Sequence, residues 1–189
     1  MGLGMRLFHF SDDPGIECFV PRPVRIASTR PPGRDWLNGP LVWAIDEMTQ
    51  PLYLFPRDCP RVLLWETPAT TAQDRDRWFG ASRARMVAHV EQAWFDRLSR
   101  ETLYRYELPI EGFEDLADAG MWVSRQAVTP LGVQTLSDLP ALLEDHGVEL
   151  RIMESLVPLR DAWSTSLHVS GVRLRLAQGW AATPDAPAR

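Results

Sequence analysis

The sequence contains no lysine: all 20 basic residues of this 189-residue chain are arginines. Without a lysine amine, Schiff-base chemistry, attachment of pyridoxal phosphate and the lysine of a phosphate-binding loop are excluded. The absence therefore narrows the chemistry that any active site here can use.

Cysteine and histidine are also scarce. Cys18 and Cys59 form no Cys-x-x-Cys pair, which is typical of reduced thiols, although a single disulfide is an alternative. The histidines show no metal-binding spacing, and they are His9, His89, His146 and His168. The pair Asp12–Asp13 offers oxygen ligands, but its place before Pro14-Gly15 is more typical of a turn. We therefore expect no metal.

The chain has no apolar run of membrane-spanning length and no signal-peptide pattern at its start, so we expect a cytoplasmic protein that does not act at a membrane. Its formal net charge of −5 argues against general nucleic-acid binding. Residues 20–40 are a local exception. They carry four arginines against Asp35, namely Arg22, Arg25, Arg30 and Arg34. Two interpretations stay open for this segment: a solvated loop, or a contact for phosphate or another anion.

Hydrophobic residues make up 45% of the chain, which is enough for a core. We expect one globular domain over residues 1–180 and a disordered tail over residues 181–189. Short apolar runs predict strands, which are residues 6–10, 41–45, 61–65, 103–108, 122–124, 131–133 and 148–152. Residues 52–55 fit either a strand or one helical turn. Prolines and glycines predict a long loop over residues 20–40.

Helices are expected in two regions. Thr70 with Gln73 resembles a capping box, and Gly80 divides the helical region that follows. Met86, Val90, Trp94 and Leu98 recur every four residues, which predicts an amphipathic helix with Ser82 as its N-cap. A second, short helix through Leu142 and Leu143 has Ser137 or Asp138 as its N-cap and ends at Gly147.

After these helices, residues 164–178 suggest one or two closing strands with a turn at Ser170-Gly171. The chain thus combines many short strands with two or three helices and no regular β–α alternation. This pattern predicts an α+β fold with mixed or antiparallel strands around a cleft.

Two serines invite a hydrolase hypothesis. Ser82 stands in a sequence close to a nucleophile elbow, but a helical stretch precedes it, which favours the N-cap. Ser166 and His168 would share a strand face, but no acid is evidently placed to orient His168, so a hydrolase triad is not favoured. A phosphate-ester enzyme that uses His9 and His168 is a weaker alternative, which requires the two imidazoles to converge.

The strongest candidate is His9, because it stands in a short apolar strand directly before a polar turn. Trp43 lies in another strand and either packs in the core or stacks a flat heterocycle. The acids around Pro109 are Glu107, Glu111, Glu114 and Asp115. They form either a solvated turn or the source of one carboxylate that stabilises a developing cation in a cleft.

Long segments of the chain resemble an uncharacterised bacterial family, a domain of unknown function. These segments are LFHFSDDPGIECFVPRP, WLNGPLVWAID, LYLFPRDCPRVLLW and LYRYELPIEGFED. The order of segments is also similar to the rifampin ADP-ribosyltransferases. Phe8-His9-Phe10 resembles their first strand, Val42–Ile45 their second strand, and the segment Tyr104–Asp115 their acidic motif.

The second resemblance implies an ADP-ribosyltransferase-like fold and NAD as substrate. It implies that His9 holds the nicotinamide ribose and Trp43 stacks the nicotinamide. It also implies that Tyr104 lines the cofactor site and that Glu114 or Asp115 is the catalytic acid. The competing hypothesis is a non-catalytic domain that binds a small molecule or nucleotide in the same cleft or at the arginine-bearing loop.

Overall fold

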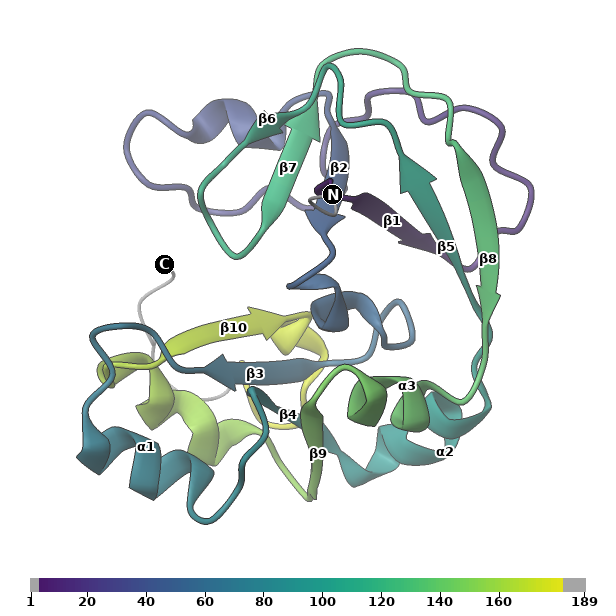
Figure 1. Ribbon diagram of the computed structural model, residues 1–189. Coiled ribbons are helices and arrows are strands. Elements are labelled where there is room, and N and C mark those ends of the chain that lie inside the picture. Colours follow the sequence, from purple (N-terminus) through teal and green to yellow (C-terminus); the bar gives the residue numbers. More distant parts are fainter. Residues whose placement is uncertain (1–3, 182–189) are drawn as a thin grey trace. The chain divides into compact units, whose positions relative to one another are not determined.

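The computed structural model describes residues 4–181 and has an α+β architecture, as expected (Figure 1). Its internal contacts divide the chain into two compact units. The described part of the first unit is residues 4–50 and 102–136, and that of the second is residues 51–101 and 137–181. Cooperative folding of residues 1–180 as one domain stays a prediction. The expected tail, apart from Ala181, lies outside the described residues.

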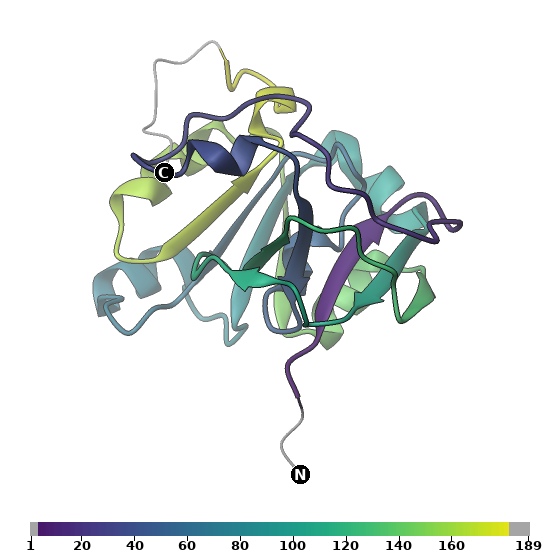
Figure 2. The ribbon, with the colours of Figure 1, turned by 90° about the horizontal axis from the view of Figure 1, so that it is seen from above.

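A six-stranded antiparallel sheet forms the first unit, in the order β6-β7-β2-β1-β5-β8. Its strands are β1 (Leu7–Ser11), β2 (Val42–Asp46), β5 (Leu103–Leu108), β6 (Glu114–Asp115), β7 (Met121–Ser124) and β8 (Gly132–Leu136). Residues 20–40 form the expected loop, drawn in dark blue in Figure 2, which contains the short 3-10 helix η1 (Asp35–Asn38). Its backbone bonds to the sheet at Leu41, which lies opposite Arg22.

The register of β1 and β2 assigns side chains to the two faces of this sheet. Phe8 lies opposite Ile45, and directly opposed residues project from the same face. Because side chains alternate along a strand, Trp43 shares the face of Phe8, whereas His9 projects from the other face. We call these the Trp43 face and the His9 face.

Each face has its own apolar cluster. The His9 face packs Leu7, Phe19, Val42, Ala44, Tyr106, Leu108 and Val128. The Trp43 face packs Leu37, Leu41, Leu116 and Val123, with Trp43 and Met121 against them. Both faces of the first unit's sheet therefore carry buried apolar side chains, and on the Trp43 face these lie over β2 and β7.

The second unit contains a four-stranded sheet in the order β10-β3-β4-β9, in which only β4 and β9 are parallel among the described strands. Its strands are β3 (Arg61–Trp65), β4 (Met86–Glu91), β9 (Val148–Met153) and β10 (His168–Val172). Its helices are α1 (Ala72–Phe79), α2 (Gln92–Arg100) and α3 (Leu139–Asp145), with the 3-10 helices η3 (Val157–Ser164) and η4 (Leu174–Leu176). The 3-10 helix η2 (Gln50–Tyr53), where the chain passes from the first unit to the second, fits the helical-turn alternative.

The predicted helix through Met86 and Leu98 is wrong. Residues 86–91 form β4, every residue of which is buried, and α2 begins only at Gln92. A central strand that is buried on both faces shows no alternation of apolar and polar residues. Its continuous apolar run therefore matched the spacing expected of the apolar face of a helix. Ser82 accordingly caps no helix; its hydroxyl accepts a bond from the Ala84 amide at 3.2 Å.

The turn predicted at Ser170-Gly171 is also wrong, because both residues lie within β10 and face Leu63 and Val62 of β3. Gly171 is required there for space: a Cβ at this position would collide with the side chains of Leu174 and Trp163. The glycine marks close packing within the second unit rather than a change of direction.

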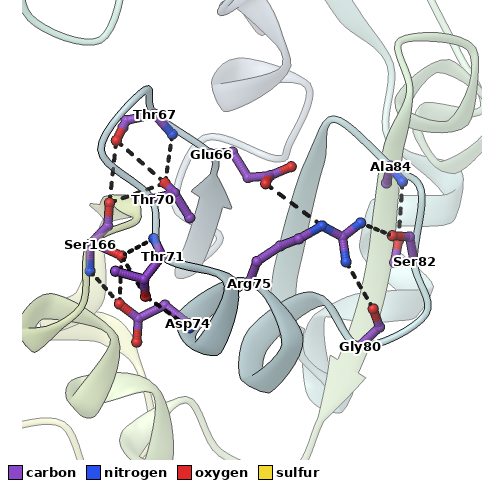
Figure 3. Close-up of polar contacts among 10 residues, drawn as sticks. All are labelled: Glu66, Thr67, Thr70, Thr71, Asp74, Arg75, Gly80, Ser82, Ala84 and Ser166. Atoms are coloured by element: carbon purple, nitrogen blue, oxygen red, sulfur yellow. Dashed lines mark hydrogen bonds and ion pairs between the residues drawn. The ribbon is translucent and has the colours of Figure 1, made fainter.

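Helix α1 begins one residue later than expected, with Thr71 as its N-cap. The Thr71 hydroxyl accepts a hydrogen bond from the Asp74 amide at 3.2 Å, and Asp74 in turn accepts bonds from the amide and hydroxyl of Ser166 (Figure 3). These bonds lower the pKa of Asp74, the Ser166 hydroxyl contributing most. These hydrogen bonds among Thr71, Asp74 and Ser166 connect the start of α1 to the segment before β10.

Candidate functional site

His9 is held at the junction of β1 and β2. Its Nδ1 lies 2.8 Å from the backbone oxygen of Trp43, so the Nδ1-protonated tautomer donates a hydrogen bond to it. The ring also lies 4.7 Å from the ring of Phe19, on the face that contains Tyr106. The imidazole thus contacts the backbone of Trp43, while the two side chains occupy opposite faces.

Trp43 has other neighbours. The guanidinium of Arg30 lies 5.7 Å from the centre of its ring, and the apolar cluster of Leu37 and Leu116 packs against it. Its indole Nε1 is buried and has no hydrogen-bond acceptor among the described residues. The ring is therefore already contacted by an arginine and by apolar side chains.

The two candidate acids lie at the edge of the sheet, in β6. Glu114 is opposite Val123, which is opposite Trp43, so it belongs to the Trp43 face; its carboxylate pairs with Arg125 at 2.9 Å. Asp115 belongs to the His9 face and accepts a bond from the Ala117 amide at 2.8 Å. Since β7 and β2 lie between β6 and β1, neighbouring strand spacings put the backbones of Asp115 and His9 about 14 Å apart.

Tyr104 shares the His9 face, since it pairs with Ser11 two residues beyond His9. Of the remaining acids, Glu107 is paired with Arg6, and Glu111 is exposed. The structure thus brings His9 and Tyr104 to one face and leaves Trp43 and Glu114 on the other. The catalytic and cofactor-binding roles of these residues stay predictions.

The Asp12–Asp13 segment forms the expected turn. The Asp13 carboxylate accepts a hydrogen bond from the Gly15 amide at 2.8 Å. The hydroxyl of Tyr106 donates to the Asp13 carbonyl at 2.7 Å and accepts from the Ile16 amide at 3.1 Å. Within residues 4–181, no group of three His, Cys, Asp or Glu side chains is arranged to hold a metal ion.

Ser166 and His168 show no triad geometry. The Ser166 hydroxyl donates directly to Asp74 at 2.6 Å, so its proton points at a carboxylate instead of an imidazole. His168 stacks on Trp65 with ring centres 4.0 Å apart. This arrangement fits helix capping better than nucleophile activation.

A pocket on the Trp43 face was missed from the sequence. It has a volume of about 150 Å³ and is lined by Arg6, Phe8, Arg105, Glu107, Gly132, Val133 and Gln134. Arg105 lies 4.7 Å from the Phe8 ring centre and donates to the amide oxygens of Gln50 and Gln134 at 2.6 and 2.5 Å. The signal was present in Tyr104-Arg105-Tyr106, because alternation puts the arginine on the face opposite the tyrosines.

The two arginines of this pocket differ in charge compensation. Arg6 donates to both carboxylate oxygens of Glu107 at 3.0 and 2.7 Å and to Glu47 at 3.3 Å. This contact lowers the pKa of Glu107 and raises that of Arg6. Arg105 has no ion pair within the described residues; burial, followed by the charge of Arg6, lowers its pKa.

Gly132 leaves the pocket open. It lies opposite Glu107, so a side chain at this position would project from the same face as that of Glu107. A Cβ added there would meet no atom within 4 Å. A larger residue at this position would therefore fill pocket space without disturbing the arginines.

Within residues 4–181, none of the helices has the length and apolar character needed to cross a bilayer. The chain has no match among curated proteins or among solved structures. A protein-family model does match, over residues 8–177, which extends from β1 to the segment after η4 and includes both units. That model describes a family of unknown function, DUF6886, and the chain belongs to this family.

Proposed function

We propose that the first unit is a binding domain for a small monocarboxylate, with Arg105 as the residue that binds the carboxylate. The observation that supports this most is a half-buried guanidinium in a pocket, fixed by two neutral amides and lacking an ion pair in the described chain. The proposal is the binding alternative that the sequence left open.

Arg105 is prepared to accept an anion. A guanidinium has five N–H donors, and two of them are used by Gln50 and Gln134. The two amides and the Phe8 ring hold the plane of the group, so little side-chain entropy is lost when a ligand binds. A carboxylate that accepts the remaining donors would form charge-assisted hydrogen bonds.

Charge and size restrict the ligand further. Among the residues that line the pocket, Glu107 balances the charge of Arg6, so Arg105 leaves roughly one positive charge on the pocket wall. The carboxylate of Glu107, with that of Glu47 on the other side of Arg6, would repel a dianion. A volume of about 150 Å³ is well below the range of pockets that enclose drug-sized ligands. The buried ring of Phe8, on the same face as Arg105 and Glu107, adds an apolar wall. These features favour a small monoanion with an apolar part.

ADP-ribosyl transfer is the other candidate activity. It requires His9, Trp43 and an acid from the segment 104–115 around one NAD molecule. The side chains of His9 and Trp43 project from opposite faces, and Arg30 already lies over the Trp43 ring, so the geometry favours binding over NAD cleavage.

Benzoate and its neutral analogue benzamide test the proposal, with dissociation constants measured by calorimetry or ligand-observed NMR. The protein should bind benzoate and not benzamide. Arg105→Gln should weaken benzoate binding by about 10- to 150-fold, because it removes hydrogen bonds to a charged group. Gly132→Val should weaken it by occupying the pocket while Arg105 remains. Arg100→Gln, the control, removes an exposed arginine from α2 and should have no effect.

Equal binding of benzamide, or benzoate binding unaffected by both pocket variants, would contradict the proposal. The same protein incubated with NAD should release no more nicotinamide than His9→Ala does. Release above that control would favour the transferase hypothesis instead.

A further inference from the structure

We propose a second anion site in the first unit, formed by Arg30 and Arg34 of the loop and by the indole N–H of Trp43, with a phosphate-class dianion as its ligand. None of these residues lines the Arg105 pocket, so this site does not depend on the proposed function.

Arg30 is fixed beside Trp43. Its Nε donates to the side-chain oxygen of Asn38 at 3.2 Å. Asn38 in turn holds the backbone of Ser28 by two hydrogen bonds, of 3.2 and 2.9 Å. The guanidinium is half buried and lies 5.7 Å from the centre of the Trp43 ring. The loop therefore presents this cation in a defined position.

Trp43 adds a donor that lacks an acceptor. Its Nε1 is buried without a hydrogen-bond partner among the described residues, and a buried donor in this state costs free energy. The Arg30 guanidinium lies near the same indole ring, so an oxyanion bound by Arg30 would lie beside the side chain that carries this donor.

Arg34 supplies a second positive charge. Both of its terminal nitrogens donate to the carbonyl of Leu116, at 3.3 and 3.4 Å, and Leu116 belongs to the cluster against which Trp43 packs. Neither Arg30 nor Arg34 forms an ion pair within residues 4–181, and the carboxylate of Glu114 is used by Arg125.

The charge of the loop fits a dianion. Residues 20–40 contain four arginines and one aspartate, which gives +3 in a chain whose formal net charge is −5. The two guanidiniums and the indole N–H supply two positive charges and hydrogen-bond donors on three separate side chains. A tetrahedral phosphate offers oxygens in several directions and two charges, whereas a carboxylate offers one plane and a single charge.

Titration of the full chain with inorganic phosphate tests this site, with calorimetry for affinity and tryptophan fluorescence as the local signal. Arg30→Gln and Arg34→Gln should each weaken phosphate binding by at least about tenfold. Trp43→Phe should remove the fluorescence response and weaken binding. Arg25→Gln is the matched control, since it removes an exposed arginine of the same loop; it should change the affinity less than about twofold.

Equal losses in Arg25→Gln and Arg30→Gln would show diffuse attraction by the loop and overturn the proposal, as would an absence of phosphate binding. Arg105→Gln separates the two sites, because it should leave phosphate binding intact while it weakens benzoate binding. If Arg105→Gln abolishes phosphate binding, the second site does not exist.

Discussion

At the residue scale, several arginines of this lysine-free chain are fixed by neutral oxygens. Arg61 in the second unit is 2% exposed, donates to the carbonyls of Leu52 and Cys59 at 2.8 and 3.0 Å, and lies over the ring of Phe55. Burial lowers its pKa to about 10, so it stays charged at neutral pH. Arg105 uses the same kind of acceptors but lines an open pocket, which is why it is the candidate binding residue.

His89 should make the protein sensitive to acid. It is buried in β4 with Nδ1 3.3 Å from the Val62 carbonyl, and burial lowers its pKa from 6.5 to about 4, with a smaller contribution from Arg151. The folded state then binds fewer protons than the unfolded state. The stability that neutral His89 contributes is fully present above pH 6.5. It is lost as the pH falls toward 4, by up to about 1.4 kcal/mol per pH unit.

Urea unfolding at pH 7 and pH 5 measures this loss. His89→Gln keeps a donor but does not titrate, so its free energy of unfolding should fall much less between the two pH values. Parallel losses in both proteins would assign the acid sensitivity to other groups, such as the carboxylates of Asp74 and Glu149, whose pKa values are lowered by hydrogen bonds.

At the element scale, the sequence predicted the features that depend on residues close together in the chain, such as helix caps. The helix predicted with Ser137 or Asp138 as its N-cap is confirmed, and the cap is Asp138, whose carboxylate accepts a hydrogen bond from the Ala141 amide at 3.3 Å. The segment Met86–Glu91 was misread because its burial comes from β3 and β9, distant in sequence. The Arg105 pocket was missed for the same reason: Gln134 and Gly132 reach it only through the pairing of β8 with β5.

The connection between β6 and β7 contains backbone strain. Ala117 and Ala119 have φ values of 52° and 47°, in the left-handed region that alanine rarely adopts. Gly120 follows with φ of 68°, and a Cβ there would collide with the side chains of Thr49 and Asp46. The two strained alanines thus lie next to a glycine whose surroundings leave no room for a side chain.

Ala117→Gly should therefore stabilise the protein. Relief of the left-handed strain, about 1–2 kcal/mol, exceeds the added entropy of an unfolded glycine, about 0.4–1 kcal/mol. Thermal unfolding should show a higher Tm for Ala117→Gly and a lower one for Ala127→Gly, an exposed position of the same unit with negative φ. A lower Tm in both variants would contradict the claim that the positive φ of Ala117 strains the backbone.

At the scale of the whole molecule, the α+β class could be read from the sequence, but the two units could not. Each unit is built from two separate chain segments, so no composition shift or linker marks a boundary. The sequence could not place the side chains of the resemblance-based site relative to one another, for a related reason. His9 and Trp43 stand in neighbouring strands, but strand register, which composition does not reveal, puts their side chains on opposite faces.

The most direct test of the account compares benzoate affinity in the wild type, Arg105→Gln and His9→Ala. We expect Arg105→Gln to weaken binding by at least about tenfold and His9→Ala to stay within about twofold of the wild type. The opposite result, with loss in His9→Ala and none in Arg105→Gln, would move the site to the His9 face and contradict the assignment to Arg105.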